Sequence, residues 1–325
     1  MSTIYIPNSV GLRNFETLFR NNTFDFSDGI ANLEFHPNYV GLHPAALAFY
    51  AALSDQLAEK DIPVSGQIDR RMKSIPFLQR MGFFKSFGFD NIVETEEHEE
   101  AGRFIPLRKI TSSAELRLFL TEIDPILHAG EDVKDAIKKV FSEILRNVLE
   151  HSKASHGGNV CAVFNKKKSK LTIGISDAGI GIFNSMKFHH VIATHQDAIL
   201  LALRPGITGT TSRLGGTAEN AGAGLFITKS IAQATRNHFL VYSGNSYYKL
   251  NLVPSASSIS YSADPLLDRH TVRSDMPFFQ GTLIGIDINT NDTPIFKDLI
   301  AKVGDIYQLS VKKAKKNYYS KIRFT

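Results

Sequence analysis

The sequence predicts a mixed α/β protein built from two units, and three observations support this prediction. Up to residue 93, strand-like and helix-like segments alternate, which favours parallel strands. From residue 103 onward, amphipathic helices are followed by pairs of short apolar segments of strand length. Between these regions, residues 94–100 include five glutamates in seven positions and are too acidic to be buried, which indicates a linker.

The length and composition agree with this division. The chain has 325 residues, 43% of them hydrophobic, which is enough material for two packed cores. We place the domain boundaries as follows: a first unit at 1–93, an acidic linker at 94–102, a second unit at 103–290 and a basic tail at 291–325.

The first unit begins with an expected strand at 30–35. A helix follows from His43-Pro44, since proline is favoured in the first helical turn. Its apolar residues recur at helical spacing: Leu47, Tyr50, Leu53 and Leu57. A strand at 62–68 and a short helix at 75–82, ended by glycine, complete the unit.

This order, with the phrase FHPNYVGLHPAALAFYAALSDQLAEKDIPVSG, resembles a STAS domain, the fold of the anti-sigma factor antagonists. Phosphorylated members of that family carry a serine at the start of the helix that follows the central strand. Here the corresponding residues 41–45 read Gly-Leu-His-Pro-Ala, without serine or threonine. The resemblance therefore implies a STAS-like docking or packing module that does not accept phosphate there.

The second unit should begin with a strand at 103–110 and a helix from Ser113. A helix at 132–151 has a clear apolar stripe. The later elements are these: strands at 161–165 and 170–176 joined by a lysine turn, strands at 238–244 and 246–253, a long loop at 254–277, and a last strand at 281–288.

Four short motifs in this unit have functional potential. In the helix at 132–151, Glu143 and Asn147 are four residues apart and share one side at the edge of the apolar stripe. An asparagine carbonyl oxygen suits Mg²⁺, and a glutamate can act as general base. Alone, the pair is also typical of a solvated helix face.

The other three motifs each include glycine. Asp177 ends a strand and precedes Gly179 and Gly181; its carboxylate can accept a hydrogen bond from an amino group such as that of adenine. Gly222, Gly224 and Leu225 open a helix, whose free N–H groups suit a phosphate. Thr282 follows Gly281 at the start of the last strand. Each motif alone is also compatible with an ordinary turn or helix entry.

Together, the segments FSEILRNVLEHS, DAGIGI, AGAGLFITKSIA and GTLIGI resemble the N box and three glycine boxes of the GHKL superfamily (gyrase B, the large heat-shock chaperone, histidine kinases and MutL). This resemblance to a histidine kinase-like ATPase domain (HATPase_c) covers about half of the chain. It implies a Bergerat-type ATP-binding fold, an α+β sandwich with a mixed sheet.

The resemblance also implies roles for individual residues. Glu143 would be the general base and Asn147 the Mg²⁺ ligand, so the cofactors would be ATP and Mg²⁺. The residues expected around the nucleotide are Asp177 and Thr282 at adenine, Gly179 and Gly181 around the base, and Gly222, Gly224 and Leu225 at the phosphates. Residues 183–221 would form a lid, in which Arg204 and Arg213 are candidates for phosphate contact.

Competing motifs fit less well. The glycines at 222–224 do not follow a strand and lack the third small residue of a dinucleotide fingerprint. Lys229 lacks the preceding glycine of a P-loop. The histidines show no zinc spacing, and His189-His190 is expected to be a surface pair.

Three functions remain open from the sequence. The first is a regulatory ATP hydrolase whose lid controls a protein partner. The second is a protein serine kinase of the anti-sigma factor kinase type, and the third is a non-catalytic nucleotide-binding adaptor. A sensor histidine kinase fits less well, because His128 is not followed by an acidic residue.

Composition bounds the setting. Cys161 is the only cysteine, so an internal disulfide is impossible. Neither a signal peptide nor a membrane span is apparent, and we expect a cytoplasmic protein. Residues 306–325 carry six basic and no acidic residues; such a tail can bind nucleic acid or be a solvated helix face. A protein partner is expected, and a homodimer remains open.

Overall fold

The computed structural model describes residues 2–22, 24–90, 92–94, 103–127, 129–209, 211, 224–254, 259–291, 302–312 and 316. These residues form a mixed α/β structure, as the sequence predicts. Most of the acidic linker and most of the basic tail lie outside the described residues, so the predicted domain boundaries stay predictions.

The N-terminal elements surround a parallel sheet in the order β1-β3-β5. The strands of this sheet are β1 (Ser2–Ile6), β3 (Ala31–Phe35) and β5 (Val64–Gly66). A separate two-stranded sheet pairs β2 (Ser9–Val10) with β4 (Gly41–Leu42). The helices of this part are η1 (Phe15–Phe19), α1 (Pro44–Glu59), α2 (Ile75–Arg80) and α3 (Phe83–Ser86). The parallel pairing of β3 with β5 confirms the prediction. The sequence analysis did not anticipate β1.

The second sheet has seven strands in the order β11-β10-β9-β12-β8-β7-β6. They are β6 (Phe104–Ile110), β7 (Gly158–Asn165), β8 (Lys170–Asp177), β9 (Phe239–Gly244), β10 (Ser246–Leu250), β11 (His270–Arg273) and β12 (Phe279–Asn289). All neighbouring pairs are antiparallel, so the expectation of a mixed sheet is wrong here. The loop expected at 254–277 is also wrong in part, because its β-branched Thr271 and Val272 lie in β11, which pairs with β10.

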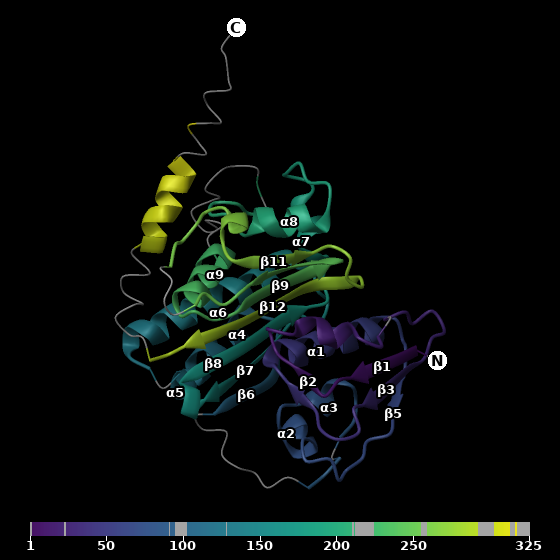
Figure 1. Cartoon of the computed structure of the whole chain (residues 1–325). Coiled ribbons are helices and arrows are strands. Elements are labelled where there is room, and N and C mark those ends of the chain that lie inside the picture. The colour runs from purple at the N-terminus through teal and green to yellow at the C-terminus, as the bar shows by residue number, and fades with distance from the viewer. Residues whose placement is uncertain are drawn as a thin grey trace.

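Helices cover one face of this sheet and the N-terminal elements cover the other (Figure 1). The covering helices are α4 (Ser113–Glu122), α5 (Asp124–Leu127), α6 (Glu131–His151), α7 (Gly181–Met186), α8 (His195–Ala202) and α9 (Gly224–Ala234). Two short helices lie in connections: η2 (Lys166–Lys168) joins β7 to β8, and η3 (Pro265–Leu267) precedes β11. A further helical stretch at 302–312 packs Val303 and Tyr307 against the same core.

Side-chain alternation along the central strands assigns the two faces. Ile175 and Ile284 belong to the core beneath α6 and α9, whereas their neighbours Ser176 and Leu283 face the N-terminal elements. Side chains point to opposite faces at every second residue of a strand. The seven-stranded sheet therefore packs against the helices α6 and α9 on one face and against the N-terminal elements on the other.

Helix α1 lies between the two sheets, and this explains its burial. Every residue from Pro44 to Asp55 is buried, not only the predicted stripe. His43 caps the helix: its Nδ1 accepts a hydrogen bond of 2.9 Å from the Ala45 N–H. Because α1 is covered on all sides over most of its length, apolar residues occur all around it, and its sequence does not show a single core-facing side.

Candidate functional site

A cavity lies between the seven-stranded sheet and the helices on its outer face. It encloses about 900 Å³ of space, counting the part open to solvent. Its walls come from α6, the ends of β8 and β12, helices α7 and α8, the loop after α8 and the start of α9. The described part of the predicted lid therefore forms one wall of the cavity.

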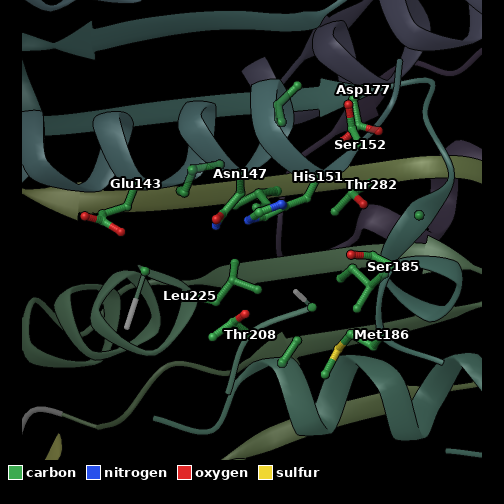
Figure 2. Close-up of a pocket in the computed structure, with 18 of the residues that line it drawn as sticks. Glu143, Asn147, His151, Ser152, Asp177, Ser185, Met186, Thr208, Leu225 and Thr282 are labelled. Carbon is green, nitrogen blue, oxygen red and sulfur yellow. The ribbon is translucent and has the colours of Figure 1, made fainter. Parts of the chain in front are cut away.

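Helix α6 supplies one wall through three polar residues. Glu143, Asn147 and His151 follow at intervals of four residues and all line the cavity. Figure 2 shows them in a row along the helix. The apolar stripe of α6 faces the sheet, so these half-buried residues lie at its margin. His151 was not predicted from the sequence as a site residue, although its position, four residues after Asn147, places it on the same side.

Asp177 lies at the other end of the cavity, at the end of β8. It is 3% exposed, and its Oδ1 accepts a hydrogen bond of 2.8 Å from the Gly179 N–H. Burial raises the pKa of Asp177 to about 7, although hydrogen bonds from the backbone of Gly179 and Thr282 act in the opposite direction. Thr282 pairs with Asp177 across β8 and β12 and also lines the cavity.

The three glycines near Asp177 have different tasks. Gly179 does not line the cavity; a Cβ there would lie 2.1 Å from the Ser152 carbonyl oxygen, so this glycine lets the loop close onto the end of α6. Gly181 does line it, with a φ of 73° that glycine adopts readily. Gly281 has a φ of 110° and lies against the Asp177 backbone.

Helix α9 brings a second backbone to the Glu143 end. A Cβ on Gly224 would lie 3.1 Å from the Glu143 Cβ and 3.6 Å from the Asn147 Nδ2, so the helix begins directly beside both side chains. Leu225 lines the cavity next to it. Gly222 lies outside the described residues.

The wall opposite α6 comes from the predicted lid. Ser185 and Met186 of α7 and Thr208 after α8 line the cavity, and none of them was singled out from the sequence. His190 contacts the Thr208 carbonyl oxygen through Nε2 at 2.8 Å, so it braces this wall. Arg204 pairs with Asp264 at 3.6 Å and does not line the cavity; Arg213 lies outside the described residues.

The arrangement separates two kinds of chemistry within one cavity. One end presents a buried carboxyl group and a hydroxyl group, a combination that suits an amino-bearing ring. The other end presents Glu143, Asn147 and the start of an eleven-residue helix, which suits an anion and a hard cation. Within the described ranges, no cluster of three or more His, Cys, Asp or Glu side chains could hold a metal ion by itself.

Comparison with known proteins finds a partial likeness. No family model matches the chain. The anti-sigma F factor of Clostridium acetobutylicum is 39% identical over 71 residues, which are 21% of this chain and 46% of that protein. The matched region thus spans less than half of that relative. This partial match agrees loosely with the resemblance of the four motifs to the GHKL superfamily.

No helix among the described residues is both long enough and apolar enough to cross a membrane.

Proposed function

We propose that this chain binds ATP with Mg²⁺ in the cavity, as a regulatory protein of the GHKL type with a Bergerat fold. The observation that carries this proposal is the placement of Asp177 and of the Glu143–Asn147–Gly224 group at opposite ends of one cavity (Figure 2). The four motifs are far apart in the sequence, so their meeting supports a common ligand.

The residues fit an adenine nucleotide. Asp177 would accept a hydrogen bond from the adenine amino group, with Thr282 beside it and Gly181 along the ring. The backbone N–H groups of Gly224 and Leu225 at the start of α9 would bind phosphate oxygens. Gly222, which lies outside the described residues, is proposed for the same role from the sequence alone. Gly179 would contribute indirectly, by closing the loop onto α6.

Asn147 and Glu143 would act at the phosphate end. Bound Mg²⁺ would neutralise phosphate charge, and Asn147 would supply one of its oxygen ligands. Glu143 would take a proton from the attacking water or hydroxyl group. Both side chains are half-buried and border Gly224, which agrees with these roles.

We further propose that the wall formed by residues 183–209 is part of a nucleotide-gated lid whose state controls a protein partner. Lids that close over a ligand exclude water and complete a site. The N-terminal unit, which we propose to be a STAS-like domain, would be a docked module and not a substrate in cis. Its residues 41–45 lie against the face of the sheet opposite the cavity.

A second candidate is a protein serine kinase that phosphorylates a partner in trans. The partial likeness to the anti-sigma F factor of C. acetobutylicum favours it. Glu143 would serve equally as a base for a serine hydroxyl group, so the site does not separate the two reactions.

The test uses the full chain with γ-labelled ATP and Mg²⁺, and follows both released phosphate and label on protein. We expect Asn147→Ala to lose Mg²⁺-dependent binding and Glu143→Ala to bind ATP without turnover. Glu131→Ala is the matched control, because Glu131 lies on the same helix, is 80% exposed and is remote from the cavity.

Each outcome separates the candidates. Phosphate release that requires Glu143 supports the ATP hydrolase. Label that appears only on an added serine-containing STAS protein supports the kinase. Binding without either reaction indicates an adaptor, and a wild-type chain that does not bind ATP contradicts the proposal as a whole.

A further inference from the structure

Helix α9 contains a buried lysine that does not face the cavity. The Lys229 side chain is 0% exposed, and its ammonium group donates hydrogen bonds to Asp268 and, at 3.2 Å, to the Ser262 carbonyl oxygen. It does not line the cavity. The sequence excludes a P-loop role for Lys229, so this charge needs another explanation.

Asp268 bonds to two successive turns of α9. Its Oδ2 pairs with Lys229, and its Oδ1 accepts a hydrogen bond of 3.0 Å from the Gln233 amide. Lys229 and Gln233 are four residues apart and therefore lie on one side of the helix. Gln233 also donates to the Ser260 carbonyl oxygen at 2.8 Å. The segment between β10 and β11 thus holds α9 at several points.

A buried ion pair of this kind is weak evidence for added stability. Removing two charges from water costs about as much as their attraction returns, and apolar residues of the same size are often at least as stable. Burial lowers the pKa of Lys229, and the neighbouring Asp268 opposes this effect. What such a pair does provide is one defined geometry between the elements that it joins.

The geometry that it defines extends to the cavity. Gly224, at the start of the same helix, is five residues from Lys229, about 7.5 Å along the axis at 1.5 Å per residue. The side of α9 that carries Gly224 packs directly against α6, because even a methyl group on Gly224 would come within 3.1 Å of the Glu143 Cβ. At 3.6 residues per turn, Lys229 and Gln233 lie on roughly the opposite side of α9 from Gly224, and their bonds to Asp268 hold that side of the helix. The start of α9 is therefore fixed between two contacts.

We propose that the Lys229–Asp268 pair is a positioning device that sets the start of α9 against Glu143 and Asn147, and so determines how strongly the site binds the phosphate groups of its nucleotide. This inference rests on the proposed function and adds the element that sets phosphate affinity. Neither residue touches the ligand; both act through α9. Their loss should weaken binding of phosphates and leave binding of the adenine ring intact.

The test compares adenosine, ADP and ATP in the presence of Mg²⁺, each titrated calorimetrically into the full chain. The principal variant is Lys229→Met with Asp268→Leu, which replaces the pair by apolar groups of similar size. We expect adenosine affinity within about twofold of the wild type and ATP affinity lower by about tenfold, the scale of a lost helix-terminus interaction. Lys138→Met is the control, since Lys138 pairs with Asp124 away from α9.

The results distinguish this inference from the proposed function. A wild-type chain that does not prefer ATP over adenosine contradicts the proposed function itself. If the wild type prefers ATP over adenosine and the folded double variant keeps the same preference, the positioning role is overturned. If the double variant does not fold, Gln233→Met decides: a preference reduced at least about twofold supports the role, and an unchanged preference overturns it.

Discussion

Gly174 and Gly285 lie opposite each other in β8 and β12, and the first turn of α1 rests on both. A Cβ on Gly174 would lie 2.1 Å from the Pro44 carbonyl oxygen, and one on Gly285 would lie 2.8 Å from the Ala45 Cβ. Two paired glycines thus form a flat place in the sheet at which the backbone of the N-terminal unit makes contact. The two glycines of the second unit therefore make room for the N-terminal unit, and a larger residue at either position would obstruct the contact.

Substitution at this contact tests the docking. Gly174→Ala forces a methyl group against a backbone carbonyl that cannot rotate away, so we expect the free energy of unfolding to fall by about 1–3 kcal/mol. Urea denaturation of the full chain measures it. Gly304→Ala is the control: nothing lies near that position, and alanine in a helix should raise stability by about 0.5–1 kcal/mol. An unchanged midpoint for Gly174→Ala would show that α1 is not seated on β8.

The sequence predicted those features whose signals are local. The period of 3.6 in α6 placed Glu143 and Asn147 on one side, and the glycine-containing segments after β8 and at the start of α9 pointed to two further parts of the cavity wall. The wall formed by Ser185, Met186 and Thr208 has no such local signal. The burial of α1 on both sides was not predictable, because it depends on a second sheet. The bond between Lys229 and Asp268 joins residues 39 positions apart, and neither stands out in its own segment.

Ser243 links the two segments that meet at the Asp177 end. Its Oγ accepts a hydrogen bond of 3.0 Å from the Ile182 N–H and donates one of 2.7 Å to the Gly281 carbonyl oxygen. Ser243→Ala leaves both backbone groups without this partner, so we expect a loss of about 1–3 kcal/mol in unfolding free energy. We also expect weaker ATP binding, because the cavity residues Gly181 and Thr282 are the direct chain neighbours of Ile182 and Gly281.

Thermal or urea unfolding with and without ATP checks this prediction. Ser65→Ala serves as the control, because Ser65 is exposed and a surface change of this kind should stay within about 0.5 kcal/mol. A Ser243→Ala protein with wild-type stability would show that water replaces the hydroxyl group without cost.

Asp177 makes the stability of the nucleotide-free protein depend on pH. Its pKa is raised from 3.8 to about 7 by burial, so between these values the folded state holds a proton that the unfolded state releases. Its contribution to stability is therefore complete below about pH 4 and is lost as pH rises through about 7. Asp177→Asn has no charge to bury, and its Oδ1 can still accept the Gly179 N–H.

We therefore expect the Asp177→Asn variant to gain stability relative to the wild type as pH rises from 5 to 8, with an upper bound of about 3 kcal/mol, because about two pH units of this window lie below the folded pKa near 7. Urea midpoints at several pH values measure the difference. A difference that does not change with pH would mean that Asp177 is ionised in the folded protein throughout this range.

Asp287 connects the two units from inside their interface. Its side chain is 4% exposed; Oδ1 lies 2.8 Å from the His43 Nε2 and Oδ2 lies 2.6 Å from the Lys170 Nζ. Because the His43 Nδ1 accepts the Ala45 N–H, the neutral ring has its proton on Nε2 and donates to Asp287. Burial alone would raise the pKa of Asp287, but His43 and Lys170 together lower it.

A lowered pKa means that the contribution of Asp287 to stability is fully present above the usual value near 4 and is lost as pH falls through the folded value. For Asp287→Asn we expect a loss of about 1.5–3 kcal/mol at neutral pH, the range for a hydrogen bond to a charged group. This deficit should be constant above about pH 5 and shrink below about pH 4, where the carboxylate of the unfolded wild type takes up a proton that the folded protein still excludes. Asp275→Asn is the control, because Asp275 forms an exposed pair with Arg273 outside the interface. If the deficit instead stayed constant into acid, the loss would come from packing of the amide and not from the charge that joins His43 to Lys170.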